Sequence, residues 1–265
     1  MAVGIAALTF LISAAARSSI APSRNRIALT SASWSAAACV AHARAALADG
    51  FEQEGVREAG ATATTWDWVD RTLKASPPPT ELGCQLEARA VGSRLDVNAS
   101  DEATLARLFR KVGMPAARAD SVAATVALRK PYVDRRELRL VRDLQTLTSL
   151  DSVLDVEPGP IALDRAPAAA LALLPGFTEE TVERVLDARA RDAPISTFHE
   201  LSQLLSPEMP DASARLPGLA VFQPTAWVIT ARATNGMPPI TAVVEVRLAR
   251  SRGGTVITRW RSWIE

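Results

Sequence analysis

A duplicated helical unit is the feature that most constrains the fold of this chain. Residues 95–144 and 161–205 carry similar landmarks in the same order. In each copy a polar residue lies seven positions before a leucine, and a proline lies six positions before a Glu-Leu pair. These positions are Asn98, Leu105, Pro131 and Glu137 with Leu138 in the first copy, and Asp164, Leu171, Pro194 and Glu200 with Leu201 in the second. Matching order at matching spacing marks an internal repeat. Two copies are too few for a solenoid, so we expect one compact helical lobe.

Length and charge limit what surrounds this lobe. The chain has 265 residues, which can bury one or two ordinary cores. Its 30 basic residues nearly balance its 29 acidic ones, leaving a net charge of +1. No global field therefore attracts nucleic acid or anionic lipid.

The beginning of the chain predicts one long helix over residues 1–55. Residues 2–16 are apolar, which is shorter than the roughly 20 residues that span a bilayer unaided. The helical pattern continues far beyond them, with Pro22 expected to kink the helix rather than end it. Small and apolar residues recur on one face: Ile27, Ser31, Trp34, Ala38, Ala41, Ala45 and Ala48. We expect a helix that is embedded in the membrane at its start and soluble later; a cleaved signal followed by an amphipathic helix is the alternative.

Strand patterns lie on both sides of the lobe. Residues 84–98 predict two strands with a turn at Gly92 and Ser93, and residues 226–233, 241–250 and 255–263 predict three more. The sequence therefore predicts an α+β fold, with the long N-terminal helix on a small antiparallel sheet and a large all-α insertion. The expected domains are residues 1–55, the N-terminal helix; 56–98, the first part of the α+β domain; 99–214, the inserted helical domain; and 215–265, the strands that complete the sheet.

This combination resembles the type II secretion system protein K family, the largest minor pseudopilins. The residues that carry the resemblance are 16–50, 94–109, 163–189 and 194–201. The resemblance implies a general secretion pathway protein with no enzymatic activity. It implies a single pass through the bacterial inner membrane, with most of the chain in the periplasm. Such a protein caps or initiates the pseudopilus tip through contacts with other minor pseudopilins.

Processing of the N-terminus is a further expectation from the resemblance. Pseudopilins carry a short basic leader that a prepilin peptidase removes after a glycine. Gly4 is the only candidate for that glycine here, and no Lys or Arg precedes it. Either the true start of the protein lies upstream of Met1, which we favour, or the protein is not processed in the usual way.

A helix-hairpin-helix reading of the repeat predicts a different function, that of a membrane-tethered or periplasmic DNA-binding protein. Such hairpins present backbone N–H groups to phosphate from a glycine-rich turn. The second copy has only Gly176 in its turn, followed by Glu179 and Glu180, and Pro115 removes a donor from the first copy. Arg110, Lys111 and Arg118 remain available to phosphate. We favour hairpins that serve helix packing, and expect no nucleic-acid partner.

Catalytic and metal sites have little support. His42 and His199 lie in unlike contexts, and no nucleophile or zinc motif occurs. Cys39 and Cys84 are expected as two buried thiols, with a disulfide possible in an oxidising compartment. Asp151, Asp155 and Glu157 are weak calcium candidates in what we expect to be a solvated linker, because calcium needs six to eight oxygens. No other cofactor is predicted.

Helix caps are the expected structural role of the polar residue in each copy. Asn98 and Asp164 follow strand-like segments, where a short polar side chain satisfies free N–H groups of the next helix. Replacing either by alanine is expected to cost about 1 kcal/mol. Glu137 and Glu200 are expected at helix starts, with Leu138 and Leu201 entering the core.

Overall fold

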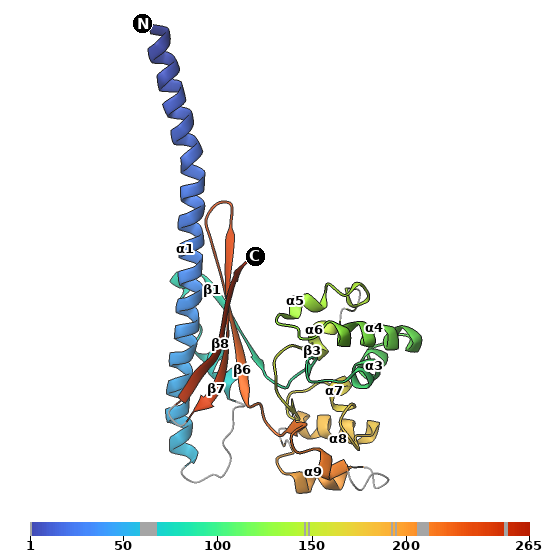
Figure 1. Cartoon of the computed structure of the whole chain (residues 1–265). Helices are drawn as coiled ribbons and strands as arrows, with labels where there is room; N and C mark the ends of the chain where they lie inside the picture. The colour runs from blue at the N-terminus through green and yellow to red at the C-terminus, as the bar shows by residue number, and fades with distance from the viewer. Residues whose placement is uncertain are drawn as a thin grey trace. The chain divides into compact units, whose positions relative to one another are not determined.

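The computed structural model describes residues 2–58, 68–145, 147, 149–191, 193, 195–205, 212–251 and 254–265 (Figure 1). Side chains are described over the same ranges except 2–21, 51–58, 212–213, 250–251 and 254. The chain divides into two compact units. One contains the N-terminal helix, residues 68–88 and the strands from Val228 onward, and the other runs from Arg89 to Trp227. The predicted domain boundaries at 55, 98 and 214 stay predictions.

The first unit is built on helix α1, Ala2–Glu58, which continues through Pro22. This confirms the long N-terminal helix. It packs on the sheet, chiefly on strand β7, and on helix α2, Val69–Ala75, and the short helix η1, Thr80–Leu82. The residues of α1 that are buried recur every three or four positions: Ala28, Ala32, Ala36, Cys39, Val40, Ala43, Ala46 and Leu47.

The face of α1 on which the sequence places small and apolar residues is not the face that meets the sheet. Ile27 and Trp34 are 70% and 72% exposed, so the face that contains them points away from the sheet. The helix has small residues on both sides, and periodicity alone does not tell which side meets the sheet. Alanines occupy the side of α1 that faces the sheet, because their small side chains let the helix approach the strands closely. A Cβ added to Gly236 would lie 2.5 Å from the Ala28 side chain.

Four strands form the sheet, in the order β1-β6-β7-β8. Their bounds are Cys84–Ala90 for β1, Ala226–Asn235 for β6, Ile240–Ser251 for β7 and Gly254–Ile264 for β8. The sheet is antiparallel, and β1 lies beside β6, which confirms that strands before and after the lobe share one sheet. The strand predicted after Gly92 is not part of it: β2, Leu95–Asp96, pairs in parallel with β3, Leu154–Asp155, in the second unit.

The second unit contains both copies of the repeat. The first copy has helices α3, Glu102–Lys111, α4, Ala116–Leu128, and α5, Arg135–Leu138. The second has α7, Ala168–Leu171, α8, Glu179–Ala190, and α9, Phe198–Leu204. The second copy opens with β4, Ile161–Ala162, which pairs in parallel with β5, Ala220–Val221. Shorter elements are η2, Arg142–Leu144, α6, Leu150–Val153, and α10, Ala212–Arg215.

One apolar cluster joins the two copies. The landmark leucines are completely buried in both: Leu105 with Leu171, and Leu138 with Leu201. Each hairpin turn uses a left-handed glycine, Gly113 at φ 95° and Gly176 at φ 76°, a conformation that glycine adopts at least cost. The repeat is therefore a structural duplication around a shared core. Pro194 lies outside the described residues.

Candidate assembly surface on helix α1 and strand β8

The helix-facing side of strand β8 extends beyond the part of the sheet that α1 covers. In the β7–β8 register, Val246 lies opposite Trp260, Val244 opposite Ser262 and Ala242 opposite Ile264. Directly paired residues of antiparallel strands project to the same face of a sheet. The three β7 residues are buried, whereas Trp260 is 48% exposed and Ile264 49%. The edge strand therefore presents apolar side chains beside α1.

A groove of about 500 Å³ runs between this overhang and the helix. On the α1 side it is lined by Leu29, Thr30, Ser33, Trp34 and Ala37. On the sheet side it is lined by Ala242, Val243, Val244, Trp260, Ser262, Trp263 and Ile264. We call this the α1–β8 groove. Three tryptophans, Trp34, Trp260 and Trp263, line this groove. Tryptophan is enriched at protein interfaces, where it contributes a large contact area.

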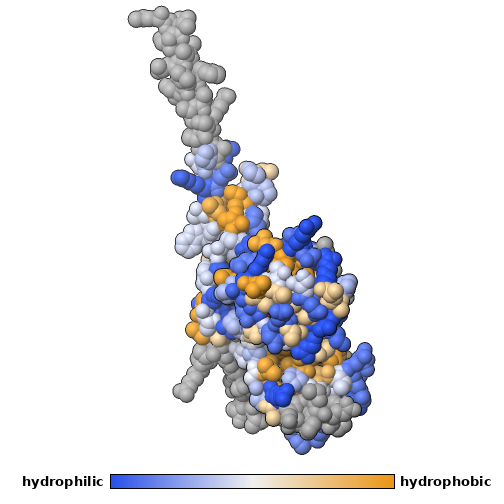
Figure 2. Space-filling model, turned by 45° about the vertical axis from the view of Figure 1, so that its right-hand side comes forward, coloured by the Kyte–Doolittle hydropathy of each residue, from blue (hydrophilic) through white to orange (hydrophobic). Residues whose placement is uncertain are grey.

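The charged side chains of α1 near the groove are all positive. Arg24, Arg26 and Arg44 are exposed, and the sequence has no carboxylate between residues 2 and 48. Hydrophilic residues cover the first described turns of α1, directly after the grey segment in Figure 2. A partner that carries carboxylates beside its own apolar face would complement this surface.

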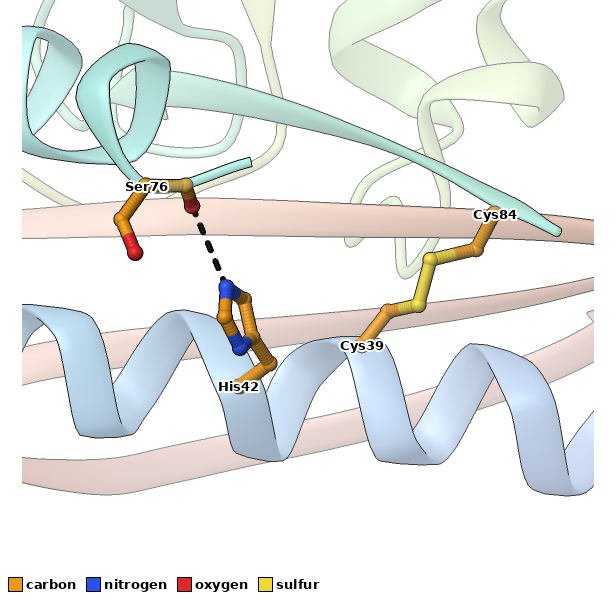
Figure 3. Close-up of a disulfide and its surroundings, with 4 residues drawn as sticks. All are labelled: Cys39, His42, Ser76 and Cys84. Atoms are coloured by element: carbon orange, nitrogen blue, oxygen red, sulfur yellow. Dashed lines mark hydrogen bonds between the residues drawn. A yellow bond between two sulfur atoms is a disulfide. The ribbon is translucent and has the colours of Figure 1, made fainter. Parts of the chain in front are cut away.

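A disulfide holds α1 to the opposite edge of the sheet (Figure 3). It joins Cys39, which is fully buried on α1, to Cys84 at the start of β1, with Cα atoms 6.7 Å apart. The sequence predicted two buried thiols, and this prediction is wrong: the cysteines form a disulfide, because the fold brings the helical segment and the strand-like segment together. Nearby, His42 Nε2 forms a hydrogen bond of 3.2 Å with the carbonyl oxygen of Ser76.

No family model matches the sequence, and none of the curated proteins does. A search of solved structures finds a chain of the crystal structure of the GspK-GspI-GspJ complex from the type 2 secretion system of enterotoxigenic Escherichia coli. The alignment covers 91% of this chain and 99% of that one, with a TM-score of 0.59 and 14% identity. This chain shares that fold. The α+β architecture implied by the resemblance to the protein K family is thereby confirmed.

The structure does not confirm the membrane segment expected at the N-terminus. Within the residues open to description, no helix is both long and apolar enough to cross a bilayer. Gly4 belongs to α1, but its surroundings lie outside the described side chains, so the proposed peptidase site stays a prediction.

Asn98 does not cap a helix. The cap of α3 is Asp101, whose carboxylate accepts a hydrogen bond from the Thr104 N–H at 2.7 Å. Asn98 instead pairs with the backbone of Tyr132, accepting from its N–H at 2.8 Å and donating to its carbonyl at 2.9 Å. Two cap-forming residues stand three positions apart here, and the sequence does not show which one the helix starts after.

Asp164 does not cap a helix either, because α7 begins after Pro167 without a side-chain cap. Its side chain is only 10% exposed, and one carboxylate oxygen is buried without a hydrogen-bond partner. Burial raises the pKa of Asp164 to about 6, against the opposing effect of Arg165 and Arg189. Arg189 also donates to the carbonyl oxygens of Ala166, at 2.7 Å, and Leu163. The second copy thus contains a buried charge cluster where the first has neutral Asn98.

The calcium candidates do not converge. Asp151 forms ion pairs with Arg135 and Arg139. Asp155 is buried against Arg89, and Glu157 is also buried, so neither lies in the solvated linker that we expected. Across the described part of the chain, no group of three His, Cys, Asp or Glu side chains is placed to hold a metal.

The remaining predicted residues have local roles. Glu137 and Asp134 form a capping box at α5, and Thr197 caps α9 while Glu200 accepts from the Ser196 N–H. His199 Nε2 lies 3.2 Å from Gln203 on the same helix. Of the basic residues near the hairpins, Arg118 is paired with Asp143 at 2.5 Å. Neither hairpin arranges a glycine-rich phosphate cradle, since Pro115 is the N-cap residue of α4 and two glutamates begin α8.

Proposed function

We propose that this chain is a minor pseudopilin of a type II secretion system, and that it caps or initiates the pseudopilus tip. The observation that carries the proposal is the fold match over nearly the full length of both chains, since the matched structure is a complex named for GspK, GspI and GspJ. The role requires shape and contact surface rather than chemistry, so we infer no catalysis, cofactor or nucleic-acid ligand.

Our proposal places the apolar start of α1 in the inner membrane before assembly and the rest of the chain in the periplasm. The Cys39–Cys84 disulfide supports an oxidising compartment, where such bonds persist. An apolar helix in lipid can exchange lipid for neighbouring helices at little hydrophobic cost, so that packing decides which partner it takes.

The α1–β8 groove is the surface that we assign to a neighbouring minor pseudopilin. Its occupant would be a helix with an apolar face, lying between Trp34 on α1 and Trp260 on β8. Carboxylates on that helix would meet Arg24 and Arg26. The duplicated unit would supply bulk at the tip.

The test measures association of the full chain, in mild detergent, with the other minor pseudopilins of the same system. Trp34→Ala and Trp260→Ala should each weaken association by about tenfold or more, as expected for interface tryptophans. The matched control is Leu128→Ala, because Leu128 is also exposed but lies on α4 in the other unit. Association that is absent in the unmodified protein, combined with micromolar binding to duplex DNA, would overturn the proposal.

A further inference from the structure

A second candidate site lies within the duplicated unit, on the exposed side of α3. Arg107, Arg110 and Lys111 line a pocket of about 360 Å³ together with Ala172 and Leu173 from the second copy. Positions three and four apart fall on one side of a helix, which explains why these cations converge. None of the described residues that line this pocket carries a carboxylate.

The hydrogen bonds of Arg107 and Arg110 go to neutral acceptors, although the charge of Arg107 also interacts with the nearby carboxylate of Asp101. Arg107 donates to the Thr104 hydroxyl at 3.3 Å, and Arg110 donates through Nε to the Ala106 carbonyl at 3.3 Å. Neither partner carries a negative charge. Among the described side chains, none of the three cations forms an ion pair, in contrast with Arg118, which is paired with Asp143. The pocket is therefore an electropositive end that an anionic group would fill.

An apolar pocket of about 630 Å³ continues from it, sharing Arg107 and Leu173. Its apolar wall comes from both copies and from the segments beside them: Leu95, Ile161, Leu174, Pro175 and Leu219. We call the two pockets together the inter-copy groove. Both copies of the repeat are needed to make it.

The polar residues that line the apolar pocket indicate which class of ligand the inter-copy groove can bind. Asp96 and Asp101 both line it. Asp101 is an exposed carboxylate that is charged at neutral pH, as an ordinary aspartate is, and hydrogen bonds from Thr104 together with the charge of Arg107 lower its pKa further. A uniformly anionic chain, such as a nucleic-acid backbone, would be attracted at Arg110 and repelled at Asp101. A ligand with charge at one end and apolar side chains at the other avoids this conflict.

We propose that the inter-copy groove binds an extended peptide segment of a partner protein, with carboxylates at Arg107, Arg110 and Lys111 and apolar side chains against Leu174 and Leu219. Arginine suits this role, because its planar guanidinium pairs with a carboxylate through two hydrogen bonds. The groove is a recognition site separate from the α1–β8 groove, and it does not depend on the assembly role proposed above.

The experiment uses the full chain in mild detergent and fluorescence anisotropy. The probes are a labelled ten-residue peptide with a Leu-Pro-Leu segment followed by Glu-Glu-Asp, the same peptide with Gln-Gln-Asn, and a 20-base-pair DNA duplex. We expect the acidic peptide to bind at least about tenfold more tightly than the neutral one, and to weaken as salt is raised. Equal affinities for the two peptides would overturn the proposal.

Charge reversal locates the site. Arg110→Glu should weaken acidic-peptide binding by about tenfold or more. Arg191→Glu is the matched control, because Arg191 is exposed at the end of α8 and also donates through Nε to a backbone carbonyl four residues earlier, at 3.3 Å. Leu219→Ala, at a half-exposed position, should weaken binding without changing its salt dependence. An equal loss in Arg191→Glu would refute the assigned place.

Two further outcomes separate the alternatives. DNA that binds more tightly than the acidic peptide, and is lost in Arg110→Glu, would replace the peptide by nucleic acid as the ligand. Association with other minor pseudopilins is expected to be unchanged in Arg110→Glu, since Arg110 lies outside the α1–β8 groove. Failure of that association in the unmodified chain would count against the proposed function alone.

Discussion

Replacing Asp164 by asparagine is expected to stabilise the protein above neutral pH. The substitution puts in the second copy the residue type that the first copy already has at Asn98. The Asp164 side chain is nearly buried, and burial raises its pKa from 3.8 to about 6. In the unfolded chain the same carboxyl is solvated. The folded state therefore holds the proton more tightly than the unfolded state does.

The sign of the pH dependence follows from this difference. A raised folded-state pKa contributes stability that is fully present below pH 3.8 and is lost as pH rises through about 6. The two values differ by an amount worth about 3 kcal/mol, which is the upper limit of what ionisation of Asp164 costs at pH 8. Asparagine is of similar size and carries no charge. Arg189 keeps its backbone acceptors at Leu163 and Ala166 in the variant.

Urea unfolding between pH 4 and pH 8 measures the effect. Asp164→Asn should be more stable than the unmodified chain at pH 8, by up to about 3 kcal/mol, and the difference should vanish near pH 4. Asp120→Asn, an exposed position on α4, is the control and should change little at any pH. A variant that is less stable at pH 8 would refute the reasoning, since Arg165 and Arg189 would then outweigh burial.

Three other substitutions test the fold. Cys84→Ser should lower the free energy of unfolding by about 2–4 kcal/mol, because the disulfide closes a loop across 45 positions, and reductant should no longer affect the variant's urea midpoint. Asn98→Ala should cost about 1–3 kcal/mol in thermal melts, now because two hydrogen bonds to the Tyr132 backbone are lost rather than a helix cap; an unchanged melt would contradict this. Gly92→Ala should cost about 2 kcal/mol or more, since φ is +84° and the added Cβ would lie 2.1 Å from a carbonyl oxygen. Gly83→Ala also has a positive φ but has open space, so its cost should stay near 1 kcal/mol, and equal costs for the two glycines would rule out the clash.

The sequence predicts the elements of this fold better than their contacts. The repeat can be recognised from the sequence because Leu105 and Leu171 both enter the core, and each keeps the same spacing from Asn98 or Asp164. The sequence does not predict which residues those two polar side chains contact. Tyr132 lies 34 positions from Asn98, and Arg189 lies one helix away from Asp164. Long-range pairing of this kind leaves no periodic signal.

The candidate surfaces show the same limit. The sequence shows that α1 has small residues on every side, but it does not show which side meets the sheet. Trp260 alternates in a strand as a core residue would, and only its place on the edge strand exposes it. The inter-copy groove needs residues 107–111 of one copy beside residues 172–173 of the other. The sequence contained the cations, with no indication of which would remain unpaired.

The two sides of α1 are suited to different kinds of contact. The sheet side has Ala28, Ala32 and Ala36 in close contact with the strands, and a disulfide follows at Cys39. Separating the helix from the sheet would require breaking a covalent bond as well as exposing this packing. The outer side has Trp34 largely exposed above a groove, with no covalent link to hold it. A partner bound to the outer side, as we propose, would not need to disturb the packing of the helix on the sheet, so that its shape and charge would decide its affinity.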